Sequence, residues 1–314
     1  MRGTHHVEVK NRDAVFKFNL FRNITIVRGN SGTGKTTLFE MISDFTRLRE
    51  ASGVNLSCDK ECVALIDIDW KNQLRYISDS IVFIDEGAEY IKTKEFAKTI
   101  KDTDNYYVIF NRENLHDLPY SVDEIYEIKA SGKYHSFTKM FQSGSKHIYS
   151  GGRLKCDTVL SEDSKSGYQF YRNFFDGSGT ECFSSESNSA IFKWLKEHED
   201  KKVFVIADGA AFGSEIDRIL KLRSIANIRL CLPESFEWLI LKSGLIKTEN
   251  IQEILKNPSE YIESAEFFSW ENFFEKYLID STVNTPFQYA KKEINPVYLN
   301  DSNSKKIMDE IYIQ

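Results

Sequence analysis

Residues 29–36, with the sequence GNSGTGKT, combine the glycines, the lysine and the threonine that a phosphate-binding loop needs. They match the pattern G-x-x-x-x-G-K-[ST], in which glycines let backbone N–H groups approach the phosphates of a nucleotide. We expect Lys35 to reach the β- and γ-phosphates and the Thr36 hydroxyl to coordinate Mg²⁺. The sequence therefore predicts a nucleotide site, with contacts from Gly29, Asn30, Ser31, Gly32, Thr33, Gly34, Lys35, Thr36 and Thr37.

A second motif contains the carboxylates that such a site requires. Residues 81–84 are apolar and are followed by Asp85 and Glu86, so the two acids are expected at the carboxyl end of a buried strand. We expect Asp85 to hold Mg²⁺. We expect Glu86 to act as the base that polarises the attacking water, which favours hydrolysis over passive nucleotide binding.

A further apolar segment, 106–110, ends at the polar residues Asn111 and Arg112. Ligand-contacting groups gather at strand ends, so either residue is a candidate for sensing the γ-phosphate. The alternative is that both are ordinary loop residues. The candidate catalytic residues are Glu86, Lys35, Asn111 and Arg112.

The elements that position these residues follow from apolar spacing. Residues 6–9 and 15–20 alternate as in a β-hairpin, and residues 24–27 form a buried strand that leads into the loop. Apolar residues recur at helical spacing from Leu38 to Leu48, and segments 123–128 and 134–141 predict closing strands. We therefore predict an α/β domain over residues 1–150, with a parallel-core sheet and an N-terminal antiparallel hairpin.

The hairpin, the loop, the segment VFIDEG and the strand after it together resemble the ABC-type and related AAA-like ATPases of the P-loop superfamily, over about residues 1–140. The resemblance implies ATP, Mg²⁺ and hydrolysis coupled to oligomerisation or to a protein partner. The sequence lacks an L-S-G-G-Q-like signature before the second motif, and SGGR at 150–153 follows it instead. A trans-acting arginine is the usual alternative, with Arg112 and Arg153 as candidates.

Residues 144–167 are rich in Ser, Gly and Lys, which predicts a linker and a domain boundary near residue 155. Beyond it, strands are expected at 168–175, 181–183, 202–207 and 225–232. Helices are expected at 189–197, from Ile216 and from Pro233. The second domain, 155–314, is thus predicted to be a smaller α/β domain with a parallel sheet and a helical C-terminal end.

Asp208 follows an apolar strand and precedes a glycine turn, so it is expected in the crevice at the carboxyl edge of the second sheet. Glu181 and Glu186 are expected to converge on it. This order of acids resembles the Toprim domain of topoisomerases, primases and overcoming-lysogenization-type nucleases. The resemblance implies that Asp208 and Glu181 bind Mg²⁺ for phosphodiester chemistry.

The Toprim pattern usually has a second aspartate where this sequence has Ala210. Glu215 or Asp217 would have to replace it for metal binding. The alternative is that Asp208 caps the next helix or binds backbone N–H groups in its own turn. A nuclease function of the second domain therefore depends on a substitute ligand.

Composition limits the partners. The net charge of -6 argues against a globally basic surface for nucleic acid, although it leaves room for a local basic groove that would bind one. No segment approaches the roughly 20 apolar residues of a membrane span, and no signal-peptide pattern is present, so a cytoplasmic protein is expected. Among five cysteines, only Cys58 and Cys62 lie close in sequence, and reduced thiols are expected.

The whole chain looks similar to small ATP-binding proteins of mobile-element and anti-phage defence systems. We expect Mg²⁺-dependent ATP binding and hydrolysis coupled to the second domain, with a homo-oligomer or a protein partner. One alternative is a nucleotide-gated scaffold or sensor that binds a protein partner with little turnover. Another is an ATP-dependent metal nuclease.

Overall fold

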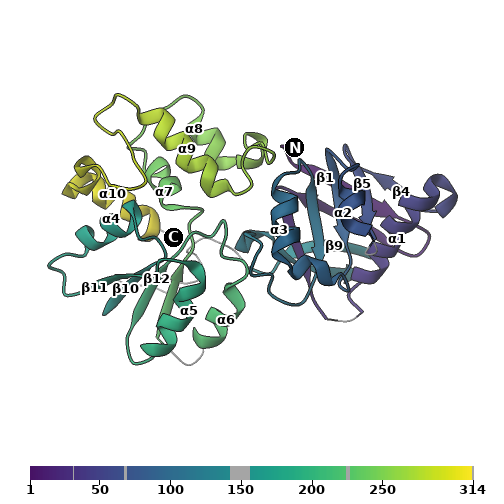
Figure 1. The fold of residues 1–314 in the computed structure, drawn as a ribbon, viewed down its shortest axis with the longest axis horizontal. Coiled ribbons are helices and arrows are strands. Elements are labelled where there is room, and N and C mark those ends of the chain that lie inside the picture. Colours follow the sequence, from purple (N-terminus) through teal and green to yellow (C-terminus); the bar gives the residue numbers. More distant parts are fainter. Residues whose placement is uncertain (31, 67–68, 142–155, 224–226, 313–314) are drawn as a thin grey trace. The chain divides into compact units, whose positions relative to one another are not determined.

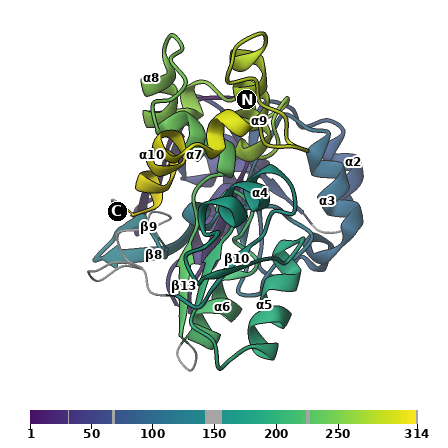
Figure 2. The same cartoon turned by 90° about the vertical axis from the view of Figure 1, so that its left-hand side faces the viewer.

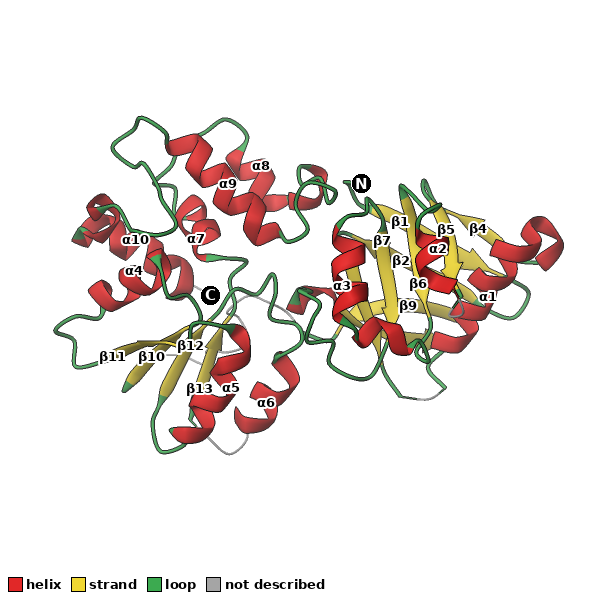
Figure 3. Cartoon of the chain, in the orientation of Figure 1, coloured by secondary structure: helices red, strands yellow, loops and turns green. Residues whose placement is uncertain are grey.

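The computed structural model describes residues 1–30, 32–66, 69–141, 156–223 and 227–312 (Figure 1). The chain divides into two compact units. Unit 1 comprises Met1–Phe141 and Asn257–Phe268, and unit 2 comprises Gln142–Lys256 and Ser269–Gln314. Each unit combines strands with helices (Figure 3), so the expected mixed α/β class is confirmed.

The sheet of unit 1 has the order β4-β1-β2-β9-β8-β3-β7-β6-β5 among the described residues. The expected hairpin is present, because β1 and β2 are antiparallel neighbours. Strands β8, β3, β7, β6 and β5 run parallel to one another. The bounds are β1 (His5–Lys10), β2 (Val15–Leu20), β3 (Ile24–Arg28), β4 (Asn55–Ser57), β5 (Glu61–Leu65), β6 (Ser80–Ile84), β7 (Tyr106–Phe110), β8 (Ile125–Ser131) and β9 (Tyr134–Lys139).

Every residue of β3, β6 and β7 is buried, as expected for central parallel strands covered on both faces. Helix α1 (Lys35–Leu48) contacts β1, β5 and β6, and buries Leu38, Met41 and Ile42 against them. The other helices here are α2 (Trp70–Leu74) and α3 (Lys94–Lys101). A rigid, buried set of strand ends therefore carries the loop and the acids of the first two motifs.

Residues 257–268 return from the second half of the sequence to pack in unit 1. The Gly3 amide donates to the Ser259 carbonyl at 2.7 Å, and the Asn23 side chain donates to the Phe268 carbonyl at 2.7 Å. The Thr4 amide also donates to a carboxylate oxygen of Glu260 at 3.0 Å. Unit 1 is thus built from two separate stretches of chain, and the second lies within the range 155–314 expected for the other domain.

Unit 2 contains a parallel sheet with the order β11-β10-β12-β13 among the described residues. Helices α5 and α6 lie on one face of this sheet and α4 on the other (Figures 1 and 2). The bounds are β10 (Thr158–Ser161), α4 (Ser166–Phe174), β11 (Glu181–Ser184), α5 (Asn188–Glu197), β12 (Val203–Ile206), α6 (Ile216–Arg223), β13 (Ile228–Cys231), α7 (Phe236–Lys242), α8 (Ile251–Lys256), α9 (Trp270–Thr282) and α10 (Asp301–Tyr312).

Three expectations for the elements of unit 2 were wrong. Residues 168–175 are not a strand, because α4 covers 166–174 and places Phe170 and Tyr171 on its buried side. The expected linker 144–167 contains the buried strand β10, while its residues up to 155 lie outside the described range. In addition, α7 begins at Phe236 with the Ser235 hydroxyl as its cap, rather than at Pro233.

None of the described helices combines the length and apolar character that a membrane span requires.

Candidate functional site

The glycine-rich loop joins the end of β3 to the start of α1. Gly29 has a φ of 129° and Gly34 a φ of 100°, a region that side chains with a Cβ rarely adopt. A Cβ on Gly34 would also lie 3.2 Å from the His135 ring and 3.4 Å from Phe16. No side chain of the described residues caps the first turn of α1, so its N–H groups are available to an anion.

Lys35 is buried, and its ammonium points back over the loop. It donates to the carbonyls of Gly29 at 2.6 Å and Asn30 at 3.1 Å. Its Nζ also lies 3.9 Å from a carboxylate oxygen of Glu86. Burial lowers the pKa of Lys35 below its usual value, an effect that the Glu86 carboxylate opposes. The Lys35 ammonium therefore lies between the carbonyls of the glycine-rich loop and the Glu86 carboxylate of the second motif.

Glu86 contacts two cations. Its other carboxylate oxygen lies 2.5 Å from Nε of Arg112, whose side chain follows β7. The structure thus brings together three of the four expected catalytic residues. We refer to the loop at 29–34 with Lys35, Glu86 and Arg112 as the P-loop site.

Asn111 was expected either to sense the γ-phosphate or to be an ordinary loop residue. It is buried, and its amide N–H donates to the Val27 carbonyl, so it does lie beside the strand that leads into the loop. Its side chain, however, donates to the Glu113 carbonyl at 3.0 Å and accepts from the Glu113 amide at 3.3 Å. Asn111 therefore closes its own turn.

The expected metal residues of the first unit are oxygen donors on neighbouring elements. Thr36 is exposed in the first turn of α1, and Asp85 is half-buried directly after β6. Mg²⁺ usually keeps several waters and takes one or two protein oxygens plus phosphate oxygens, so this donor set fits a magnesium–nucleotide complex. Ser31 and Arg153 lie outside the described residues.

Sequence reasoning missed Arg28, the buried last residue of β3. Its guanidinium donates to Asn114 at 2.9 Å and to the Tyr120 hydroxyl at 3.0 Å. These bonds fix the segment after β7 against the strand that leads into the loop. A charged residue at the end of a buried strand was the available signal.

A second cluster of charged side chains lies in unit 2, at the carboxyl ends of β10 and β12. The register pairs Ser161 with Ile206, so Glu162 and Asp208 both lie just beyond the ends of adjacent strands. The Asp208 amide donates to a Glu162 carboxylate oxygen at 2.8 Å. Burial raises the pKa of Glu162 to about 7 and raises the pKa of Asp208 well above its usual value.

Lys291 is the cation of this cluster. Its Nζ lies 2.9 Å from a carboxylate oxygen of the fully buried Glu237 and 3.7 Å from one of Glu271. Burial alone would lower the pKa of Lys291, but Glu237 and Asp208 outweigh it and raise that pKa. Glu162, Asp208, Glu237, Glu271 and Lys291 form the acidic cluster.

Glu237 is incompletely satisfied. One of its oxygens accepts from the Tyr289 hydroxyl at 2.5 Å and from Lys291. Its other oxygen, Oε2, is buried and has no hydrogen-bond partner among the described residues. A buried, unpaired carboxylate oxygen is costly, so this position is suited to a further donor or cation.

The structure does not bring Glu181 to Asp208. Glu181 is the first residue of β11 and pairs with Thr158, at the opposite end of the sheet from Asp208. Its exposed side chain contacts Lys201 at 3.1 Å. Glu162 occupies the position beside Asp208 that was expected for Glu181. Sequence reasoning missed Glu162 because the segment that forms β10 was interpreted as a linker. Of the two expected substitutes, Glu215 is buried and forms an ion pair with Arg218.

No group of three or more His, Cys, Asp or Glu side chains within the described ranges is arranged to hold a metal ion. No protein-family model matches the chain, and no curated protein matches it.

Proposed function

We propose that unit 1 binds ATP with Mg²⁺ and hydrolyses it. The observation that carries the proposal is the meeting of Lys35, Glu86 and Arg112 beside a glycine loop at a helix N-terminus. Two cations, free helix N–H groups and a carboxylate form a site that is complementary to a triphosphate and to an attacking water. The absence of an N-K-x-D-like guanine-reading motif favours adenine over guanine.

In the proposed reaction, Lys35 exchanges the Gly29 and Asn30 carbonyls for phosphate oxygens, because an ammonium binds phosphate more strongly than neutral carbonyls. Thr36 and Asp85 would hold Mg²⁺, which neutralises charge on the phosphates when bound. In this reaction, Glu86 and the γ-phosphate would compete for the guanidinium of Arg112. Its transfer to phosphate would release Glu86 to accept a proton from the attacking water.

Steady-state ATP hydrolysis with Mg²⁺ tests this proposal. We expect Glu86→Gln to lower turnover by about 100-fold or more while ATP still binds. Glu89→Gln is the matched control, because Glu89 follows the same strand but is exposed and pairs with Lys92. Equal turnover in wild type and Glu86→Gln would refute the assignment of the base. Tight ATP binding without wild-type turnover would favour the nucleotide-gated scaffold.

A second candidate function concerns unit 2, for which we propose a Toprim-like, metal-dependent phosphodiester chemistry. The adjacency of Glu162 and Asp208, together with the unpaired oxygen of Glu237, supports it. Glu162 and Asp208 would hold a divalent cation, and Lys291 would pair with a substrate phosphate. Ala210 remains in the place of a usual ligand, so the cation would rely on oxygens from Glu237 or the substrate.

Cleavage of DNA and RNA with Mg²⁺ or Mn²⁺ distinguishes this candidate. We expect Glu162→Gln and Asp208→Asn to abolish cleavage and to leave ATP hydrolysis unchanged. Glu181→Gln is the matched control, because it changes a glutamate of the same sheet that lies at the other end. Cleavage that survives both cluster variants would remove unit 2 from the chemistry, and the nuclease alternative would be abandoned.

A further inference from the structure

A pocket opens in unit 1 beside the ends of β2 and β9, and it shares no residue with the P-loop site. Its volume is about 360 Å³, which lies within the range of pockets that hold small molecules. None of its lining residues is acidic, and four of them are aromatic: Phe18, Phe21, Tyr126 and Phe137. The pocket is therefore suited, in size and in the chemistry of its wall, to a small flat molecule.

The aromatic side chains hold one another in place. The rings of Phe18 and Phe137 stack, with 4.0 Å between their centroids and 7° between their planes. The Tyr126 ring lies 5.9 Å from that of Phe137. On its other side, Phe18 meets Phe83 of the buried strand β6 edge-on at 6.3 Å. The wall is thus formed before a ligand arrives, and aromatic rings favour a further ring in offset or edge-on contact.

The Tyr126 hydroxyl supplies a polar group without a partner. The residue is 4% exposed, and its hydroxyl has no hydrogen-bond partner among the described residues. The neighbouring Glu124 carboxyl is not in hydrogen-bonding geometry with it, although burial and then the charge of Glu124 raise the pKa of Tyr126. The hydroxyl therefore keeps its proton, and a buried donor without an acceptor is costly. An acceptor atom of a ligand would satisfy it.

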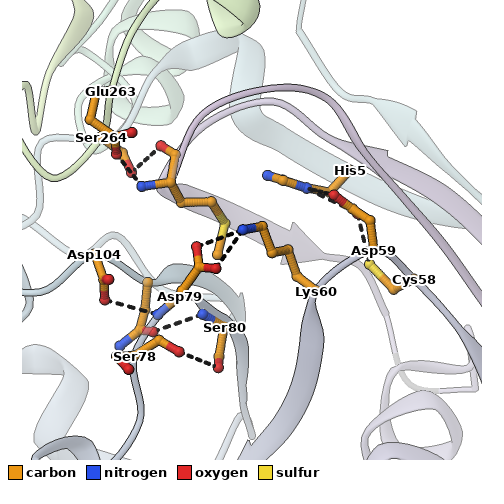
Figure 4. Close-up of polar contacts among 12 residues, drawn as sticks. His5, Cys58, Asp59, Lys60, Ser78, Asp79, Ser80, Asp104, Glu263 and Ser264 are labelled. Carbon is orange, nitrogen blue, oxygen red and sulfur yellow. Dashed lines mark hydrogen bonds and ion pairs between the residues drawn. The ribbon is translucent and has the colours of Figure 1, made fainter.

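Lys139 adds a positive charge at the same place. Strands β8 and β9 are antiparallel, and their register puts Lys139 directly opposite Tyr126, so the two side chains share one face of the sheet. Lys60, for comparison, donates to Asp79 at 2.7 Å (Figure 4). Lys139 forms no ion pair or side-chain hydrogen bond within the described ranges. One acidic group of a ligand could therefore contact both the Lys139 ammonium and the Tyr126 hydroxyl.

Lys17 also lines the pocket and increases its positive charge. Its Nζ lies 2.7 Å from one carboxylate oxygen of Glu8, and Nζ of Lys10 lies 3.2 Å from the other. One carboxylate thus balances two ammonium groups, and Lys139 contributes a third. The rim of the pocket is therefore expected to attract an anion.

We propose that this pocket binds a small aromatic anion, a molecule in which one or two flat rings carry a phosphate or a carboxylate group. The rings pack against Phe21 and Phe137, while the acidic group accepts from the Tyr126 hydroxyl and pairs with Lys139. Lys17 adds attraction at longer range. Both halves of the ligand are needed, because a bare ring leaves the hydroxyl unsatisfied and a bare anion leaves the aromatic wall in contact with water.

Equilibrium dialysis of the full chain tests the proposal with 1-naphthyl phosphate as the probe. We expect its two halves, 1-naphthol and inorganic phosphate, each to bind about tenfold more weakly or less. Comparison with 1-naphthoate distinguishes the two kinds of acid, because the natural ligand should carry the group whose naphthyl compound binds more tightly. Equal affinity for 1-naphthol, or no binding of either acid, would overturn the proposal. So would loss of binding in Lys35→Met, because the probe would then occupy the P-loop site.

Variants of the pocket locate the binding site. Lys139→Gln and Tyr126→Phe should each weaken binding of 1-naphthyl phosphate by about tenfold. Lys129→Gln is the matched control, because Lys129 is an exposed lysine of β8 that pairs with Glu127 at 2.7 Å and does not line the pocket. Tyr126→Phe should not lower the urea midpoint of unit 1, read from the buried Cys62 thiol, since the hydroxyl has no partner without ligand. Wild-type affinity in both pocket variants would refute the site.

Discussion

The P-loop site and the acidic cluster occupy equivalent places in two different sheets, but their charges are opposite. Each lies where parallel strands end, the edge at which α/β sheets bind ligands. In the P-loop site, Lys35 and Arg112 outnumber the single carboxylate of Glu86. The acidic cluster has four carboxyl groups and one lysine. The same edge of a sheet therefore favours an anion in unit 1 and a cation or protons in unit 2.

Among the tests of this contrast in charge, removal of the Lys291 ammonium should give the largest effect, a loss of stability in unit 2. Lys291→Met leaves the fully buried Glu237 without its cation, and breaking a buried pair costs about 3–5 kcal/mol. Urea-dependent labelling of two buried thiols measures the unfolding of each unit. Cys62 reports on unit 1 and Cys231 on unit 2. We expect Cys231 to react at lower urea and Cys62 to be unchanged.

Lys276→Met is the control for that variant, because it breaks the exposed i,i+4 pair with Asp280, worth about 0.5 kcal/mol or less. Glu237→Gln in the Lys291→Met background should recover part of the loss, since it removes the unpaired charge. An unchanged Cys231 transition in Lys291→Met would show that the lysine does not balance the cluster.

The next prediction, of intermediate size, concerns how the stability of each unit depends on pH. Burial raises the pKa of Glu124 in unit 1 to about 7, as it does for Glu162 in unit 2. Between their ordinary value of 4.5 and about 7, the folded chain holds protons that the unfolded chain releases, so stability falls as pH rises through this window. Glu124→Gln and Glu162→Gln should each flatten this fall in their own unit.

Divalent cation then distinguishes the two carboxyl groups. Saturating Mg²⁺ should flatten the fall in the stability of unit 2 with rising pH, because it favours the ionised form of Glu162. It should leave the pH dependence that Glu124 gives to unit 1 unchanged. Glu124 is buried beside Arg22, with 3.7 Å between Nε and a carboxylate oxygen. The same thiol labelling at pH 5, 6, 7 and 8, corrected for reagent rates in unfolded protein, gives both profiles. If Mg²⁺ changed the pH dependence of stability in unit 1 alone, the assignment of the cation to the carboxyl groups of unit 2 would be wrong.

The smallest expected effect concerns Arg112. Its ion pair with Glu86 is half-exposed, so Arg112→Ala should change stability by less than about 1 kcal/mol. Turnover should nevertheless fall by about tenfold, because the arginine would stabilise charge on the phosphates. Arg112→Lys should retain part of the rate. A rate increase in Arg112→Ala would mean that the arginine only restrains Glu86.

The P-loop site was largely predictable from sequence because its determinants are local. The loop, the helix after it and the acids after β6 are each contiguous, and apolar spacing marks the elements that carry them. The contact between Glu86 and Arg112 was not predictable, since it depends on β7 lying between β3 and β6. Strand order in a sheet is a long-range property that local spacing does not encode.

Of the members of the acidic cluster, sequence reasoning expected only Asp208 at this edge of the sheet, and it missed the others for physical reasons. Strand β10 has Thr158 and Ser161 at its ends, so its apolar run is too short to stand out from a polar segment. The aromatic residues of α4 favour strands by propensity, although Phe170 and Tyr171 occupy one face of a helix. Lys291 lies far from Glu162 in sequence, and tertiary packing alone brings it to the cluster.

The return of residues 257–268 to unit 1 has a consequence for synthesis on the ribosome. The partners of Gly3 and Asn23 are Ser259 and Phe268, so the first unit lacks part of its packing until the chain has emerged beyond residue 268. At about 5–20 residues per second, the intervening stretch delays completion by on the order of ten seconds. The nascent first unit is therefore expected to wait, partly open, while most of the second unit is translated.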